Sequence, residues 1–315
     1  MNRQSLLQSL AGANAAGQTP AQADILLLQT PTREALQARA RQFLALLRPD
    51  REDCGREDPG AWKEGEERTV VHLPEGARAI LYHASGALRY ASGLAPPEQA
   101  FEREPGRDAL LRLLEERARA LALGDWAGAG NGLRFERLFR TLGRGADREG
   151  RQAATTLFRA TGAWRQVVGG LPVLGGASAA LTLAGDGRLD GLAIRARPLA
   201  GEVLERAALI EPEAGARQIV WQLGALLGQR EIPDDLLESA SMQLGYLDLG
   251  KRKTQRVLAP AYVAQVVLKH RSVRQAYVLA ARATERPYLE LPVYGGEAVA
   301  ARTRGAGGHC GPAAA

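Results

Sequence analysis

Few side chains in this 315-residue chain have the types and spacing that chemical reactions need. Its four histidines are widely separated: His72, His83, His270 and His309. The H-E-x-x-H motif, in which two histidines one helical turn apart bind zinc beside a glutamate base, is absent. The phosphate-binding G-x-x-x-x-G-K-S/T motif and the G-x-S-x-G nucleophile motif are absent as well. We therefore expect no metal and no cofactor, and we favour a function that is not enzymatic.

Two histidines keep an enzymatic alternative open. His83 lies in a predicted strand and is followed by the turn sequence ASG. His309 stands beside Cys310, and such a pair could bind a metal or provide an activated thiol. His309 and Cys310 belong to the Gly- and Ala-rich segment 301–315, which we expect to be a disordered tail. Cys54 and Cys310 are the only cysteines; they could pair in an oxidising compartment, whereas free thiols are expected inside the cell.

The formal charge of +6 is carried almost entirely by arginine. Most arginines are interleaved with acidic residues, which is typical of a solvated surface. The dense basic run is Gly250–Arg256, and Arg195 and Arg197 add to it. A basic protein associated with nucleic acid is a second alternative. Nucleic acid is not the expected partner, because aromatic residues near the basic run are sparse, with only Tyr246 and Tyr262.

The first half of the chain predicts a mixed region. Residues 1–31 are expected to be a flexible arm, and residues 32–150 an N-terminal α+β region. Apolar residues at helical spacing predict a helix at the start of this region and another over about 107–123. Between them, alternating residues predict a hairpin over 77–94. The Gly-rich connection that follows the second helix is the predicted domain boundary.

The second half predicts two strands, a helix and two further strands over residues 151–300. In the first hairpin, Leu181 and Leu183 share one face, GDG forms the turn, and the return strand is apolar. Leu189 breaks the alternation there, and Gly191 favours a β-bulge. The expected fold class is α+β, with an antiparallel sheet packed against an amphipathic helix.

Four motifs in this half carry a family resemblance. The strand AWRQVV leads into a G-x-P-V-x-G-G turn formed by Gly170, Pro172, Val173, Gly175 and Gly176. The sequences LTLAGDGRLDGL, IEPEAGARQI and LAPAYVAQVVL follow in order. Over about Thr155–Thr284 this arrangement resembles the propeptide modules of thermolysin-type metalloproteases and the related PepSY domains. The chain departs from the family's Asp-Ala-x-Thr-Gly ending, because it reads ARAT and then Glu285. Residues 76–123 repeat a looser hairpin-plus-helix order and could be a second copy.

The resemblance implies a module that binds a protein or peptide partner without catalysis. Such a module would inhibit a peptidase-type partner in trans or assist its folding. The expected contact surfaces are the Gly170–Gly176 turn and the strand that carries Tyr262 and Val266. Sheet faces and edge strands of this kind are suited to holding a peptide.

The sequence contains no apolar run of signal-peptide length near its start, and ADILLLQT is too short to cross a bilayer. We expect a cytoplasmic protein that does not associate with a membrane, with secretion left open. The partner's identity and the oligomeric state are open as well.

Overall fold

The computed structural model describes residues 3–15, 19–30, 32–46, 61–128, 132–146, 148–228, 236–270 and 273–291. It is mostly β, with 46% strand and 26% helix. The predicted fold class, an α+β module with one sheet packed against one helix, is therefore wrong. The physical reason is long-range pairing: the strands expected to form one small sheet join different partners, some of them from the first hundred residues.

The chain divides into two compact units, each assembled from separate segments. Unit 1 comprises Met1–Ile25, Val203–Leu247 and Ala259–Ala315. Unit 2 comprises Leu26–Glu202 and Asp248–Leu258. The Gly-rich connection before residue 150, expected to separate domains, lies inside unit 2. The expected N-terminal arm contains a helix, α1 (Arg3–Ala15), and a strand, β1 (Gln22–Leu28).

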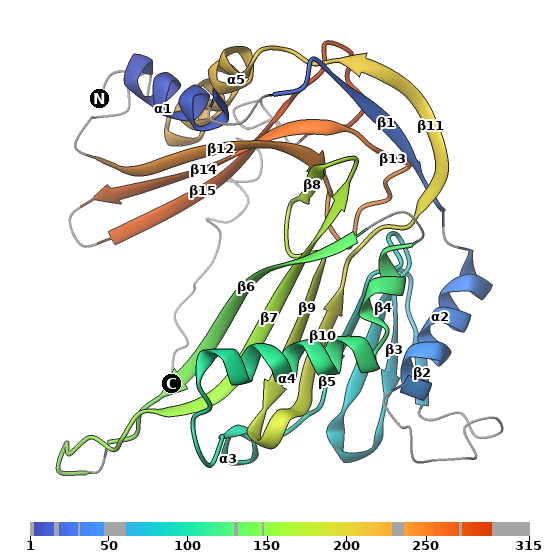
Figure 1. The fold of residues 1–315 in the computed structure, drawn as a ribbon, viewed down its shortest axis with the longest axis vertical. Coiled ribbons are helices and arrows are strands. Elements are labelled where there is room, and N and C mark those ends of the chain that lie inside the picture. Colours follow the sequence, from blue (N-terminus) through green and yellow to red (C-terminus); the bar gives the residue numbers. More distant parts are fainter. Residues whose placement is uncertain are drawn as a thin grey trace, which may run out of the picture. The chain divides into compact units, whose positions relative to one another are not determined.

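Nine strands form the large antiparallel sheet of unit 2 within the described residues (Figure 1). They are β2 (Ala61–Glu64), β3 (Arg68–His72), β4 (Arg78–Tyr82), β5 (Leu88–Ala91), β6 (Gly132–Gly143), β7 (Thr156–Val168), β8 (Leu171–Leu174), β9 (Ala179–Ala184) and β10 (Arg188–Ile194). Neighbours pair in the order β7-β9-β10-β5-β4-β3-β2, while β6 and β8 also pair with β7. A separate short pairing joins β1 to β13 (Val257–Leu258).

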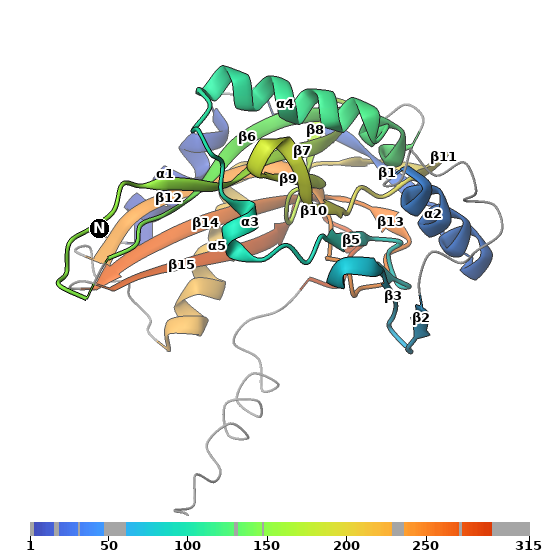
Figure 2. The ribbon, with the colours of Figure 1, turned by 90° about the horizontal axis from the view of Figure 1, so that it is seen from below.

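One face of this sheet is apolar and carries the core of unit 2. Leu181, Leu183 and Ile194 point to this face and are almost completely buried. Helix α4 (Arg107–Ala120) lies across it (Figure 2), and its Leu110 and Leu114 are fully buried against the strands. Helix α2 (Arg33–Leu46) adds Phe43 and Leu44 to the same cluster. The spacing that predicted both helices is thus the spacing of the residues that they bury.

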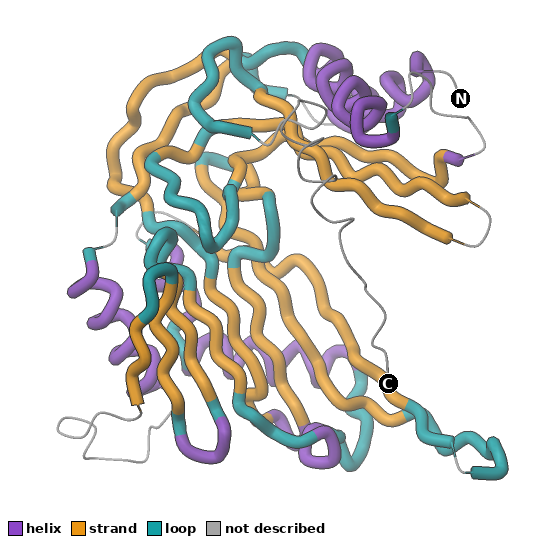
Figure 3. The backbone as a smooth tube through the Cα atoms, turned by 180° about the vertical axis from the view of Figure 1, so that it is seen from behind, coloured by secondary structure: helices purple, strands orange, loops and turns teal. Residues whose placement is uncertain are grey.

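Over β9, β10 and the middle of β7, the opposite face of the sheet carries small and polar side chains, among them Thr161, Thr182 and Ala193. Seen from behind, the strands of unit 2 lie in front of α4 (Figure 3). The predicted bulge is present in β10, where the pairing with β9 shifts register between Leu189 and Gly191. The extra residue is Asp190. Because a bulge reorients the residue that it inserts, this shift decides where the Asp190 carboxylate points.

Unit 1 contains the antiparallel sheet of β12 (Leu237–Leu247), β14 (Pro260–His270) and β15 (Val273–Arg282). Helix α5 (Pro212–Leu227) contacts β14 and β15, and α1 contacts α5 and β12. A Cβ atom at Gly215 would lie 2.4 Å from Cδ2 of Tyr262, so glycine is what lets α5 approach the sheet so closely. The remaining elements are β11 (Leu199–Ala208), α3 (Pro96–Gln99) and the 3₁₀ turns Pro74–Gly76, Leu123–Ala127 and Gly185–Gly187.

Candidate functional site

A groove of about 660 Å³ lies on the polar face of the unit 2 sheet. Its floor comes from neighbouring strands and consists of short side chains: Ala180 and Thr182 of β9, Gly191 and Ala193 of β10, and Thr161 of β7. The Oγ1 atoms of Thr161 and Thr182 lie 2.9 Å apart and hydrogen bond to each other. Alanine and glycine leave space above the backbone, so the groove follows from small residues at positions that face away from the core.

The rim of the groove is basic. Arg89 comes from β5, Arg195 follows the end of β10, and Lys251 comes from the segment 248–258. None of these three cations forms an ion pair with a described residue. A fourth cation, Arg159 of β7, is already paired. The groove therefore presents three positive charges that are available to a ligand.

Asp190 is the only acidic side chain among the described residues that line the groove, and its charge is neutralised. The carboxylate is almost completely buried; its Oδ2 accepts a hydrogen bond from Arg159 Nε at 2.6 Å. Its Oδ1 accepts one from Ser92 Oγ, also at 2.6 Å. Both carboxylate oxygens are occupied, so Asp190 offers little repulsion to an anion nearby.

Lys251 is held over an aromatic ring at the rim. Its Nζ lies 4.6 Å from the ring centroid of Tyr82, a cation–π distance. Ser85 Oγ donates a hydrogen bond of 2.7 Å to the Lys251 carbonyl, which fixes the backbone beneath the side chain. Burial raises the pKa of Tyr82, but hydrogen bonding to Lys251 and Arg68, together with their positive charges, outweighs burial and lowers this pKa below its ordinary value.

Arg197 anchors the segment that carries Lys251. The Arg197 side chain is buried; its Nε donates to Asp248 Oδ1 at 2.6 Å, and the side chain of Asp248 is 10% exposed. The Nη2 atom donates to the carbonyls of Gly250 and Lys253 at 2.9 and 3.2 Å. Gln166 in turn bonds to both the backbone N–H and the carbonyl of Arg197. These bonds hold the backbone on both sides of Lys251 in place, so the position of Lys251 at the rim does not depend on a ligand.

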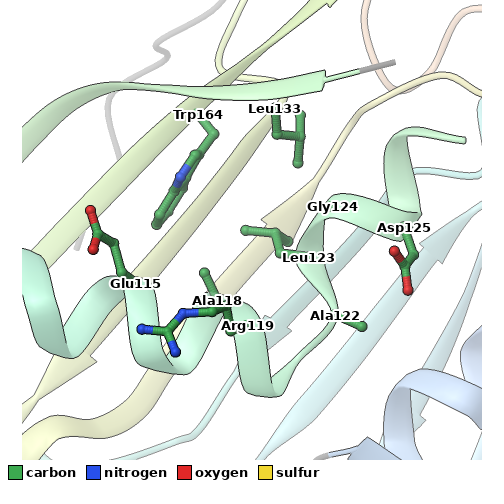
Figure 4. Close-up of a pocket in the computed structure, with 9 residues that line it drawn as sticks. All are labelled: Glu115, Ala118, Arg119, Ala122, Leu123, Gly124, Asp125, Leu133 and Trp164. Carbon is green, nitrogen blue, oxygen red and sulfur yellow. The ribbon is translucent and has the colours of Figure 1, made fainter. Parts of the chain in front are cut away.

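A second cavity of about 500 Å³ lies beside α4 (Figure 4). Trp164 of β7 and Leu133 of β6 form its apolar side, and α4 contributes Glu115 and Arg119. Charges of both signs therefore border it: Glu115 and Asp125 against Arg119. Because charges of both signs are present, this cavity does not favour an anionic or a cationic ligand. The groove on the opposite face is therefore the stronger candidate for a binding site.

The candidate catalytic histidine has structural partners. His83 Nε2 lies 2.8 Å from Thr69 Oγ1, and His83 Nδ1 lies 3.0 Å from the Glu66 carbonyl. The carbonyl can only accept, so Nδ1 carries the proton and Nε2 accepts from the threonine hydroxyl. These bonds tie the turn after β4 to the start of β3. Cys54, His309 and Cys310 lie outside the described residues.

The predicted contact turn, Gly170–Gly176, packs against its own chain. Pro172 and Val173 are buried, and Gly170 adopts φ +81° in the turn between β7 and β8. Gly175 has φ +114°, and a Cβ there would lie 2.4 Å from the carbonyl oxygen of Asp248. The carbonyl of Gly176 accepts a hydrogen bond from Arg165 Nη1 at 2.9 Å. The close approach that Gly175 permits is therefore made to Asp248.

The other predicted contact residues, Tyr262 and Val266, are fully buried in unit 1. Their strand, β14, pairs with β12 on one side and β15 on the other, so it is not an edge strand. Tyr262 Oη donates to the Ile210 carbonyl at 2.7 Å. Both side chains belong to the core as the structure describes it.

Sequence reasoning did not single out Arg89, Arg159 or the alanine positions of the floor. A signal for Arg89 was present, because it alternates with Leu88 and Tyr90 in the predicted hairpin and must face away from them. No local signal placed Arg89 beside β10, since their pairing joins segments about a hundred residues apart.

Comparisons with known proteins identify no family. No protein-family model matches the chain, and no curated protein matches it. Among solved structures, an uncharacterized protein from Eubacterium rectale ATCC 33656 is similar at 9% identity and a TM-score of 0.44, covering 87% of this chain and 86% of that one. A similarity of this degree assigns neither a fold family nor a function. The resemblance to propeptide and PepSY modules stays a prediction. Within the described part of the chain, no helix is long and apolar enough to cross a membrane.

Proposed function

We propose that this protein binds an acidic polypeptide segment without catalysis, and that the segment lies extended in the groove of unit 2. The observation that carries the proposal is the combination of three cations, none of them in an ion pair with a described residue, and a floor of alanine, glycine and threonine side chains. The floor leaves room for a backbone, and the cations select carboxylates.

Arginine supports this ligand chemistry more specifically than charge alone does. A guanidinium can donate two parallel hydrogen bonds to one carboxylate, and such bonds are stronger than those between neutral groups. Arg89 is exposed and Arg195 is partly buried, so both are accessible to a ligand. The threonine hydroxyls on the floor can donate to, or accept from, a peptide backbone.

A polypeptide fits the groove better than a nucleic acid. Platforms for single-stranded nucleic acid stack successive bases on several aromatic side chains. Among the described residues, Phe139 is the one large aromatic side chain that is at least half exposed near this face. Tyr82 is buried, and Lys251 already covers its ring.

Fluorescence anisotropy with three labelled probes tests the proposal: a glutamate-rich decapeptide, its glutamine counterpart and an oligothymidylate. We expect the glutamate peptide to bind near physiological salt and the glutamine peptide not to bind. Arg89→Glu should weaken binding at least about tenfold, because it replaces an attraction by a repulsion. The matched control is Arg112→Glu, which makes the same change at an exposed position on α4, across the sheet from the groove.

Two results would overturn the proposal. One is failure of the acidic peptide to bind, and the other is tighter binding of the oligonucleotide with the same dependence on Arg89. Circular dichroism and thermal unfolding of each variant establish that a loss of binding is not a loss of fold.

A further inference from the structure

One row of side chains crosses the polar face of unit 2 at right angles to five strands. The paired residues run in register from β5 through β10, β9 and β7 to β6. In order they are Arg89, Ala193, Ala180, Ala163 and Arg137. The row therefore has an arginine at each end and three alanines between them.

The two arginines differ in one respect, because Arg89 lines the groove and Arg137 does not. Arg89 and Arg137 are both exposed, and neither forms an ion pair with a described residue. Neighbouring strands lie about 4.8 Å apart, so four strand steps place the two backbone positions roughly 19 Å from each other. None of the three alanines has a long side chain of its own: Ala193 and Ala180 are partly exposed and line the groove, whereas Ala163 is only 5% exposed.

The next row on the same face ends in an aromatic residue. Its members are Gly191, Thr182 and Thr161, and Thr161 pairs with Phe139 of β6. Phe139 is 50% exposed, and the Arg137 guanidinium lies 5.7 Å from its ring centroid. The β6 end of the face thus offers a cation and an apolar surface side by side.

We propose, resting on the proposed function, that the ligand crosses the strands and carries two acidic residues about six positions apart. One carboxylate binds Arg89 and the other binds Arg137, with an apolar ligand side chain beside the second acid on Phe139. An extended peptide advances about 3.3 Å per residue, so six residues span the distance between the arginines. An even spacing also projects both acidic side chains toward the sheet.

Nine-residue peptides of identical composition test this spacing. Each contains two glutamates among serines, placed six, three or one position apart, and NMR titration measures affinities into the millimolar range. We expect the six-position peptide to bind the tightest, about fivefold more tightly than the adjacent pair. Arg137→Ala should remove most of that advantage and leave the adjacent-pair peptide unaffected, since a single exposed ion pair contributes a few-fold in affinity.

Arg140→Ala is the matched control on the same strand. Arg140 pairs with Ala160, a core position, and bonds to Glu104, so it belongs to the other face. A charge exchange adds an independent measurement: Arg137→Glu should lose the six-position peptide and gain one whose second glutamate is replaced by lysine. This gain cannot arise from misfolding.

The outcomes separate the two proposals. If acidic peptides bind equally at every spacing and Arg137→Ala changes nothing, the crossing mode is wrong while acidic-peptide binding stands. If no acidic peptide binds, both proposals fail.

Discussion

At the scale of single residues, Arg197 is the side chain on which the groove depends most. Its guanidinium and the Asp248 carboxylate are both buried and bonded to each other. Replacing Arg197 by alanine leaves that carboxylate without its cation, and breaking a buried pair in this way costs about 3–5 kcal/mol. We expect urea unfolding of Arg197→Ala to show a loss of this size.

Arg206→Ala is the control for that measurement. Arg206 pairs with Asp24 at 3.4 Å, but the Arg206 side chain is 69% exposed. Pairs of this kind contribute about 0–1 kcal/mol. Equal losses in the two variants would contradict the anchoring role of Arg197.

Tyr262 makes the free energy of unfolding depend on pH in the alkaline range. Burial, helped by the carboxylates of Glu211 and Glu213, raises its pKa from 10.0 to about 12. The unfolded chain thus releases the phenolic proton at lower pH than the folded protein does. The stability linked to this proton is fully present below pH 10 and is lost as pH rises toward 12.

Tyr262→Phe should flatten this pH dependence. At neutral pH the variant should lose about 1–3 kcal/mol, because the Ile210 carbonyl loses its donor. Between pH 10 and 12 its thermal midpoint should fall less than that of the wild type. Tyr277→Phe, which removes an exposed hydroxyl bonded to Gln275, should retain the wild-type slope. Parallel curves for wild type and Tyr262→Phe would contradict the argument.

At the scale of elements, the bulge in β10 couples stability to binding. Asp190→Asn removes the charge that pairs with Arg159 and should lower the free energy of unfolding by about 1–3 kcal/mol. The same change frees Arg159 in the groove, so the affinity for the acidic decapeptide should rise about twofold to fivefold. Urea unfolding and anisotropy check the two effects on one preparation.

A loss of stability together with a gain in peptide affinity distinguishes Asp190 from a residue that only stabilises the fold. Glu104→Gln, which removes the partner of Arg140 on the other face, should change neither quantity appreciably. A folded Asp190→Asn variant with unchanged or weaker peptide binding would contradict the role given to this carboxylate.

Individual elements were predictable because their signals are local. Periodic apolar residues predicted α2 and α4, and broken alternation predicted the bulge before Gly191. The sheet was not predictable, because alternation fixes which face a residue occupies but not which strand lies next to it. The groove depends on that missing information: Gly191, Thr182 and Thr161 form part of its floor only once three strands pair in one register.

The N-terminal elements were missed for a related reason. Leu6 and Leu10 of α1 are buried, one turn apart, in a segment otherwise rich in glutamine, serine, glycine and alanine. Three leucines in thirteen residues, of which Leu7 breaks the one-turn spacing, are a weak periodic signal. The helix is stabilised by its contacts with α5 and β12, which lie about two hundred residues later in the chain.

At the scale of the whole molecule, the chain passes between its two units four times. Unit 2 takes most of its residues from one long segment but needs Asp248–Leu258 to supply Asp248 and Lys251. The Gly-rich turn after β8 is part of this arrangement, because Gly175 packs on the Asp248 carbonyl. The turn that the sequence predicted to contact another molecule thus packs against a later segment of the same chain.

This interleaving also sets an order for assembly on the ribosome. Unit 2 gains its last segment when residue 258 is made, while β14 and β15 of unit 1 are still missing. Helix α1 is made before the other described elements, yet the elements that it contacts, α5 and β12, follow about two hundred residues later. This helix therefore waits for its partners until β12 has been made, and Leu6 and Leu10 face water or a chaperone during translation of the segment between them.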